Sequence, residues 1–186
     1  MIAGVDEAGR GPLAGPVVAG AVILKRFSFK ATIDNSKKLS EKKRESAYRE
    51  IFKKALVGIG IVDEKVIDKI NIYQATRLAM KRAIRALGAV PEYILVDGNM
   101  RLDIPHPQKQ IIGGDAKSIS IAAASIIAKV TRDRIMCEYD LAYPSYGFKY
   151  HKGYPTARHK KALLRYGPSP IHRYSYAPVK EVAKGV

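Results

Sequence analysis

The feature that most constrains this chain is a short apolar run that stops at two adjacent carboxylates. Residues 2–5 (Ile-Ala-Gly-Val) precede Asp6 and Glu7, and Gly-Arg-Gly follows at residues 9–11. The run is too short and too β-branched for a helix, so it predicts a strand that ends at Asp6. Side chains alternate along a strand. Asp6 and Glu7 can therefore share a site only if the backbone breaks at Glu7 or offers a carbonyl there.

The same pattern returns in the middle of the chain. An apolar stretch that begins at Glu92 ends at Asp97, which glycine follows, and Asp115 lies after two glycines at the entrance to a long helical segment. Two alternatives without a functional site exist. Asp6 and Glu7 can form a solvated acidic turn after an edge strand, and Asp115 can simply cap the helix. The recurrence of an Asp at a strand end favours a site.

The periodicity of apolar residues outlines the remaining elements. It predicts strands at 17–24, 56–62 and 109–112, and helices at 41–54, 72–87, 118–141 and 157–166, with a short helical turn at 63–64. The first two strands should form a hairpin-like pair. Tyr48, Ile51 and Phe52 should face the core, and Asp133 should form an ion pair on its helix rather than bind metal.

Charge and composition point to the partner and the compartment. The 33 Lys and Arg residues against 17 Asp and Glu give the 186-residue chain a net charge of +16, which favours a nucleic-acid partner. A membrane surface is the alternative, but no segment combines a basic face with a bulky apolar one. The single cysteine, Cys137, and the lack of a leading apolar segment fit a soluble, cytoplasmic protein without a signal peptide.

Four carboxylates at strand ends or before a helix would repel one another without cations. Oxygen ligands favour Mg²⁺ or Mn²⁺ over zinc. In a two-metal site, such ions clamp the attacking and leaving oxygens of a phosphoryl transfer. An acidic site in a basic protein suits a nuclease. A non-catalytic nucleic-acid-binding protein is the alternative from another functional class, but an acidic groove would repel nucleic acid and disfavours it. A transposase or integrase is a third hypothesis.

Several sequence blocks together resemble type 2 ribonuclease H, that is, bacterial-type ribonuclease HII. The blocks are Val-Asp-Glu-Ala-Gly-Arg-Gly at 5–11, Asp-Asn-Ser-Lys-Lys-Leu at 34–39, Val-Asp-Gly at 96–98, Gly-Asp-Ala-Lys-Ser at 114–118, Ala-Ala-Ala-Ser-Ile-Ile-Ala-Lys at 122–129 and His-Lys-Gly-Tyr at 151–154. They occur in the family order and cover nearly the whole chain. One position departs, because Pro155 stands where the family more often has glycine.

The resemblance implies an α/β fold of the ribonuclease H type. This fold is a mixed five-stranded sheet whose first three strands are antiparallel, flanked by helices, with an added helical C-terminal portion. We expect one catalytic domain over residues 1–186, in which about residues 143–186 form a substrate-binding extension. The tyrosines and basic residues of that quarter suit a nucleic-acid groove, although packing can also explain them.

The resemblance also implies the activity and the site residues. It implies a Mg²⁺- or Mn²⁺-dependent endonuclease, expected to be monomeric and to serve DNA replication and repair. It would cut RNA in RNA/DNA hybrids and 5′ to single ribonucleotides in duplex DNA, leaving 3′-OH and 5′-phosphate ends. The implied metal ligands and catalytic residues are Asp6, Glu7, Asp97 and Asp115, with Asp6 as the bridge between ions. The implied substrate-binding residues are Gly9, Arg10, Gly11, Lys37, Lys38, Lys117, Ser118 and Tyr154, with Lys129 as a further phosphate contact.

Overall fold

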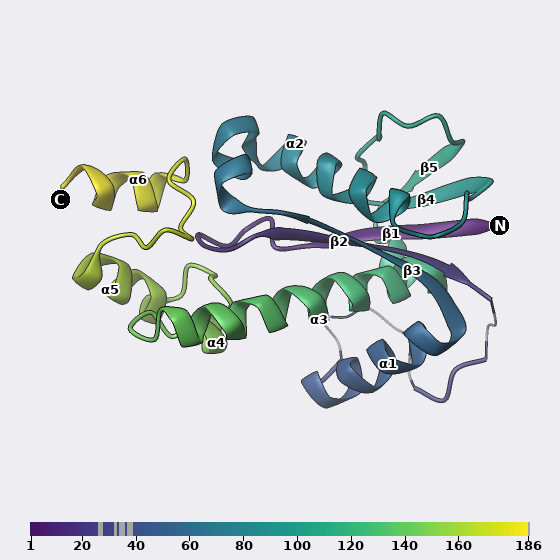
Figure 1. Ribbon diagram of the computed structural model, residues 1–186, viewed down its shortest axis with the longest axis horizontal. Helices are drawn as coiled ribbons and strands as arrows, with labels where there is room; N and C mark the ends of the chain where they lie inside the picture. Colours follow the sequence, from purple (N-terminus) through teal and green to yellow (C-terminus); the bar gives the residue numbers. More distant parts are fainter. Residues whose placement is uncertain (26–27, 32, 34–35, 37–38, 186) are drawn as a thin grey trace.

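The computed structural model describes residues 1–25, 28–31, 33, 36 and 39–185. Its centre is a five-stranded sheet with the strand order β3-β2-β1-β4-β5 (Figure 1). The strands are β1 (Ile2–Ala8), β2 (Val17–Leu24), β3 (Ala55–Val62), β4 (Tyr93–Asp97) and β5 (Gln108–Ile111). The first three pair antiparallel, whereas β4 and β5 continue the sheet in parallel with β1. This confirms the predicted mixed sheet.

Helices cover both faces of the sheet and continue beyond it at one end (Figure 1). They are α1 (Glu41–Lys54), α2 (Glu64–Arg85), α3 (Ile119–Ala142), α4 (Phe148–His151), α5 (Ala157–Tyr166) and α6 (Ala177–Lys184), with a 3₁₀ turn, η1, at Gly114–Ala116. One apolar cluster joins α2 to one face, and a second joins α1 and α3 to the other. No described helix is long and apolar enough to cross a membrane.

Two glycines let α3 lie directly on the sheet. A Cβ built on Gly4 would stand 2.2 Å from the Ser120 carbonyl carbon, and one on Gly20 would stand 2.5 Å from the Ala124 carbonyl oxygen. Any side chain at either position would push the helix away. This close approach brings the middle of α3, which carries several cavity residues described below, next to the carboxyl end of β1.

The first strand is longer than the sequence predicted. It continues through Ala8, because β2 pairs with it as far as Ala8 opposite Val18. Pairing with β4 stops earlier, at Val5 opposite Val96. The prediction that the strand ends at Asp6 was therefore wrong. Asp6 and Glu7 lie on a regular strand at the point where it loses its neighbour on one side.

The other strand predictions and most helix predictions are confirmed within two residues, but two details were wrong. The turn at 63–64 and the helix predicted from residue 72 belong to one helix, α2, with a kink at Asn71 where φ is +66°. Phe52 does not face the core, because 46% of its surface is exposed, whereas Ile51 is fully buried. The alternative that Asp115 caps the long helix does not hold, because Ser118 occupies the N-cap position of α3.

Candidate active site

A cavity of about 520 Å³ opens where β1 runs past the end of β4. It brings together all four predicted acids, the predicted glycine loop and the predicted tyrosine. The residues around it are Asp6, Glu7, Ala8, Gly9, Arg10, Gly11, Ser36, Ile72, Asp97, Asp115, Ser125, Lys129 and Tyr154. These come from β1, β4, η1, α2, α3 and the loop before α5, so the fold gathers segments that are far apart in sequence.

The two acids of β1 are held in a largely buried environment. Asp6 is 5% exposed, and its Oδ1 accepts a hydrogen bond of 2.7 Å from the Glu7 backbone N–H. Burial raises the pKa of Asp6 well above its ordinary value, and the charges of Glu7 and Asp97 raise it further. Burial also raises the pKa of Glu7, although Arg10, at 3.5 Å, works in the opposite direction. Negative charge is thus unfavourable here unless a cation joins it.

The other two acids are connected through the backbone. Asp97, the last residue of β4, accepts a 2.6 Å hydrogen bond at Oδ1 from the N–H of Gly114. Gly114 begins the 3₁₀ turn that carries Asp115. A built Cβ on Gly114 would lie 3.1 Å from the same carboxylate oxygen, so glycine allows this approach. The contact fixes the distance between the two segments.

The donor set fits a hard divalent cation. All four acidic side chains offer oxygen only, which suits Mg²⁺ or Mn²⁺. In the described part of the chain, no three acidic, histidine or cysteine side chains are already gathered as a metal-binding group. Burial is the main cause of the raised pKa values of Asp6 and Glu7, and the charge of Asp97 raises both further. Binding an ion would relieve the repulsion between these charges and draw the side chains inward.

The glycine loop forms another part of the cavity lining, and its two glycines differ. Gly9 has φ of +100°, and a Cβ there would lie 2.1 Å from Nε of Arg132. Gly9 is therefore required by the fold itself. A Cβ on Gly11 would meet only a carbon of the Tyr154 ring at 3.7 Å, which is an ordinary contact. The space in front of Gly11 belongs to the cavity.

Two buried arginines, which sequence reasoning missed, hold this loop. Arg173 is fully buried and donates hydrogen bonds to the carbonyl oxygens of Gly9 (2.6 Å), Arg10 (3.0 Å) and Gly15 (2.9 Å). Its acceptors are neutral, so burial lowers the pKa of Arg173. A charged group thus fixes the carbonyl direction of the loop predicted to recognise the substrate.

Arg132 connects the same loop to the tyrosine segment. It is 1% exposed and donates to the carbonyl oxygens of Pro16 (2.9 Å), Ala14 (3.1 Å) and Lys152 (2.9 Å). Its guanidinium carbon lies 5.9 Å from the ring centroid of Tyr154. Burial lowers its pKa to about 10, so it remains charged at neutral pH.

Tyr154 is also fixed by a chain of neutral histidines. His172 Nδ1 accepts from the Ser169 N–H at 2.9 Å, so its Nε2 donates to His159 Nε2 at 3.0 Å. His159 Nδ1 then donates to the Tyr154 carbonyl oxygen at 2.9 Å. Burial lowers the pKa of His159 to about 4 and that of His172 to about 3. The 42% exposed ring of Tyr154 is thus presented by an ordered backbone.

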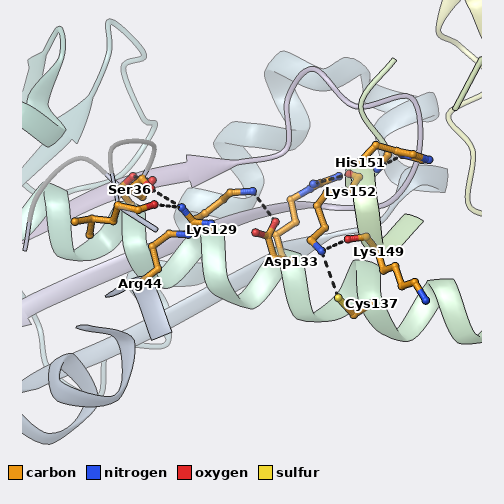
Figure 2. A network of polar contacts seen from close by, with 12 residues as sticks. Ser36, Arg44, Lys129, Asp133, Cys137, Lys149, His151 and Lys152 are labelled. Carbon is orange, nitrogen blue, oxygen red and sulfur yellow. Dashed lines mark hydrogen bonds and ion pairs between the residues drawn. The ribbon is translucent and has the colours of Figure 1, made fainter. Parts of the chain in front are cut away.

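A second set of polar contacts runs along α3 from the acidic end of the cavity toward the tyrosine segment (Figure 2). Ser36 and Ser125, both buried, share a 2.8 Å hydrogen bond, and Arg44 donates to the Ser36 carbonyl at 3.0 Å. One turn along the helix, Lys129 pairs with Asp133 at 2.6 Å. The predicted ion pair of Asp133 is confirmed. Lys129 lies on the cavity wall, and its contact with a phosphate stays a prediction.

Four predicted substrate contacts remain apart from this cavity or outside the description. Lys117 is exposed and donates to the Ile112 carbonyl at 2.8 Å. The Ser118 hydroxyl bonds the Ser120 hydroxyl at 3.0 Å. Neither side chain belongs to the cavity lining. Lys37 and Lys38 lie outside the described residues. All four assignments stay predictions.

Comparison with known proteins identifies what this arrangement is similar to. The family model described as Ribonuclease HII matches residues 3–179. A Ribonuclease HII of Enterococcus faecalis is 58% identical over 183 residues, which is 98% of this chain and 71% of that protein. A Ribonuclease HII of Bacillus velezensis is 59% identical over 181 residues, which is 97% of this chain and 71% of that protein.

Solved structures agree with the sequence relatives. The ribonuclease H2 from Pyrococcus horikoshii superposes with a TM-score of 0.84 at 27% identity and covers 99% of this chain and 97% of that one. Bst-RNase HIII, solved in complex with Mn²⁺, has a TM-score of 0.75 at 17% identity and covers 100% of this chain and 70% of that one. At that identity the likeness shows the fold alone.

Proposed function

The chain belongs to the ribonuclease HII family and is a type 2 ribonuclease H, and we propose that it cuts RNA/DNA hybrids and single ribonucleotides in duplex DNA. The observation that carries this proposal is the shared cavity of acids, glycine loop and tyrosine. It combines a site for hydrolysis with surfaces that can read a sugar. In this proposal the cut falls 5′ to the ribonucleotide and leaves 3′-OH and 5′-phosphate ends.

The four acids would hold the divalent ions. The charges of both Glu7 and Asp97 raise the pKa of Asp6, which supports Asp6 as the residue that would bridge two ions. Two bound Mg²⁺ or Mn²⁺ ions would activate a water molecule and stabilise the leaving oxygen of an in-line displacement. The connection from Asp97 to Gly114 supports this role, since it holds β4 and the turn with Asp115 at a set distance.

The glycine loop and Tyr154 would recognise the sugar at the cut. A 2′-hydroxyl both donates and accepts hydrogen bonds, so it can be read by backbone groups. The open space before Gly11 allows such a group to approach. The exposed face of Tyr154 would then pack on the next sugar, which must lack a hydroxyl at an RNA-to-DNA junction. Arg10, exposed at the rim, is available to a phosphate.

The C-terminal segment would serve as the substrate-binding part of a single domain, acting as a monomer in the cytoplasm during DNA replication and repair. Two contacts support the link between this segment and the site. Arg173 bonds the glycine loop directly, and the histidine chain ends on the Tyr154 carbonyl. The helices α5 and α6 lie together at the end of the molecule away from β5 (Figure 1).

The test is digestion of a DNA duplex that contains one ribonucleotide, in parallel with Mg²⁺, Mn²⁺ and EDTA. We expect a single cut 5′ to the ribonucleotide with either metal and none with EDTA. An all-DNA duplex should remain intact and an RNA/DNA hybrid should be cut. Binding without cleavage under every metal condition would support a non-catalytic nucleic-acid-binding protein instead. Joined DNA strands among the products would support a strand-transfer enzyme.

A further inference from the structure

We propose that a second cavity, beside the candidate active site, binds a phosphodiester of the same nucleic-acid strand that the active site engages. This inference rests on the proposed function and extends it. The cavity has a volume of about 850 Å³ and lies between α2 and residues 101–107, which connect β4 to β5. Its wall includes Arg77, Arg101, Asp103 and His106. None of these residues borders the active-site cavity.

The two cavities are neighbours along α2. Ile72 borders the active-site cavity, and the next residue, Tyr73, borders the second one. Arg77 is five residues beyond Ile72, which is about 7.5 Å along the helix axis and about 140° around it, at about 1.5 Å and about 100° per residue. Successive phosphates of a duplex strand advance about 3.4 Å along its axis. A strand that crosses the active site would therefore reach Arg77 within a few nucleotides.

The charge of the wall favours an anion. Asp103 is the acid of this wall, and Lys81 neutralises it through a 3.0 Å ion pair. The charges of Arg77 and Arg101 are then in excess. A guanidinium can donate two parallel hydrogen bonds to one phosphate, so two arginines on one wall suit a phosphodiester better than an uncharged base.

Two enclosed polar atoms support the same conclusion. Arg77 Nε and His106 Nδ1 are buried and have no hydrogen-bond partner among the described residues. Buried polar atoms are nearly always paired, and exceptions usually indicate an unseen water or ion. Arg77 does donate from Nη1 to Gln74 at 3.2 Å, so its side chain is oriented while its Nε stays unsatisfied. Nε–H of Arg77 is a donor, so an anion or its ordered water would supply the acceptor that it lacks.

The experiment compares neutral linkages in the substrate with neutral side chains in the protein. The ligand is a DNA duplex with one ribonucleotide, in which one phosphodiester at a time is replaced by an uncharged methylphosphonate. Dissociation constants are measured by fluorescence anisotropy in EDTA, so no cleavage occurs. The proteins are the full wild-type chain, Arg77→Gln/Arg101→Gln, Arg101→Gln alone, and Arg85→Gln. Arg85 is exposed on the same helix and borders neither cavity.

We expect wild-type affinity to fall about tenfold when one linkage, a few nucleotides from the ribonucleotide, is neutral. The double variant should bind the unmodified duplex about tenfold more weakly than wild type. Making that linkage neutral should not lower the affinity of the double variant any further. Its logarithmic salt slope should fall by about two. Arg85→Gln should behave as wild type, and the exposed Arg101→Gln should show about half of the effect without a change in melting temperature.

A double variant that matches Arg85→Gln in affinity and salt slope would overturn the proposal. So would an equal loss in wild type and double variant at every neutral linkage, because the arginines would then contact no particular phosphate. Cleavage by wild type with Mg²⁺ is scored separately. Its absence would contradict the proposed function, whereas intact cleavage with no linkage effect would contradict the second cavity alone.

Discussion

The two walls of the active-site cavity are built in different ways. The acidic wall comes from strand ends, so the sheet itself positions Asp6, Glu7 and Asp97. The glycine loop has no such support, and two buried arginines position it through hydrogen bonds to backbone carbonyls. Charge is unfavourable on both sides, because burial raises the pKa of Asp6 and lowers that of Arg173. The fold thus buries negative charge in the cavity lining and positive charge behind the glycine loop.

If the acidic wall performs the chemistry, Asp97→Asn should lower kcat by about a thousandfold or more. Asparagine keeps an oxygen that can accept from Gly114, so the fold should survive while the ligand charge is lost. Turnover is measured at saturating Mg²⁺ alongside a melting curve. Asp133→Asn is the control, since Asp133 only pairs with Lys129 on α3. Near wild-type turnover in Asp97→Asn, or an equal collapse in both variants, would show that the wrong acids were chosen.

If the loop wall depends on buried charge, Arg173→Gln should lower kcat/KM about a hundredfold on every ribose-containing substrate. A displacement of about 1 Å at a reacting group can cost about that much. The carbonyls of Gly9, Arg10 and Gly15 lose donors. Buried acceptors without partners cost about 1–3 kcal/mol each, so a fall of about 6 °C or more in melting temperature is expected.

The control for this variant is Arg85→Gln, which removes an exposed arginine from α2 that borders neither cavity. It should change neither the melting temperature nor the cleavage rate by a measurable amount. If Arg173→Gln kept wild-type cleavage, the loop would be held by its own backbone, and the contrast between the two walls would disappear.

The acidic wall could be predicted from sequence, whereas the support of the loop wall could not. An Asp at the end of an apolar run is a local signal, and so are the caps and turns that place α1 and α5. The bond from Arg173 to Gly9 joins residues 164 positions apart. Arg132 stands in a polar stretch, Thr-Arg-Asp-Arg at 131–134, that is typical of a solvated helix face. Only the docking of α3 against Gly4 and Gly20 brings it inside.

Pairing across the sheet explains the error at β1. The prediction ended the strand at Asp6 because glycine and arginine follow, but β2 supplies partners as far as Val18. Such pairing depends on the second strand and cannot be read from the first alone. The short helices α4 and α6 show the same limit, since their positions depend on packing around Tyr146, Phe148 and Val179.

The two glycines of the loop should separate folding from recognition. Gly11→Ala should leave the melting temperature unchanged, because the new Cβ meets only the Tyr154 ring at 3.7 Å. Cleavage of both hybrid and single-ribonucleotide substrates should fall about tenfold, as the Cβ keeps the sugar away. Gly9→Ala should instead destabilise the protein, since its φ is +100° and Arg132 fills the space. A stable and fully active Gly11→Ala variant would remove Gly11 from the sugar contact.

Tyr154→Ala should cause a smaller and selective loss. The acids and the glycine loop stay in place, so we expect kcat/KM to fall about tenfold on the single-ribonucleotide duplex and only about twofold on a long hybrid. Base or sugar contacts with aromatic rings contribute about 1–3 kcal/mol. Tyr93→Ala, a similarly exposed tyrosine at the start of β4, is the control. Parallel losses on both substrates with a lowered melting temperature would mean that Tyr154 only packs the C-terminal segment.

The smallest effect concerns stability against pH, where the acidic wall and the histidines that hold the Tyr154 backbone should respond with opposite signs. The pKa values of His159 and His172 fall from 6.5 to about 4 and about 3, so the unfolded state binds more protons. Their contribution to the free energy of unfolding is present above about pH 6.5 and is lost on acidification toward pH 4. The raised pKa values of Asp6 and Glu7 act in reverse. Their contribution is present below the ordinary values of 3.8 and 4.5 and is lost as pH rises.

Urea denaturation in EDTA between pH 4 and pH 8 measures how the free energy of unfolding changes with pH on the acidic and on the alkaline side. His159→Gln should reduce the loss of stability on acidification, because glutamine cannot be protonated in this range. Asp6→Asn should reduce the loss on the alkaline side, and added Mg²⁺ should do the same for wild type by compensating the carboxylate charge. Identical pH profiles in all three proteins would mean that neither the acids nor these histidines couple protonation to stability, and the comparison would reduce to geometry alone.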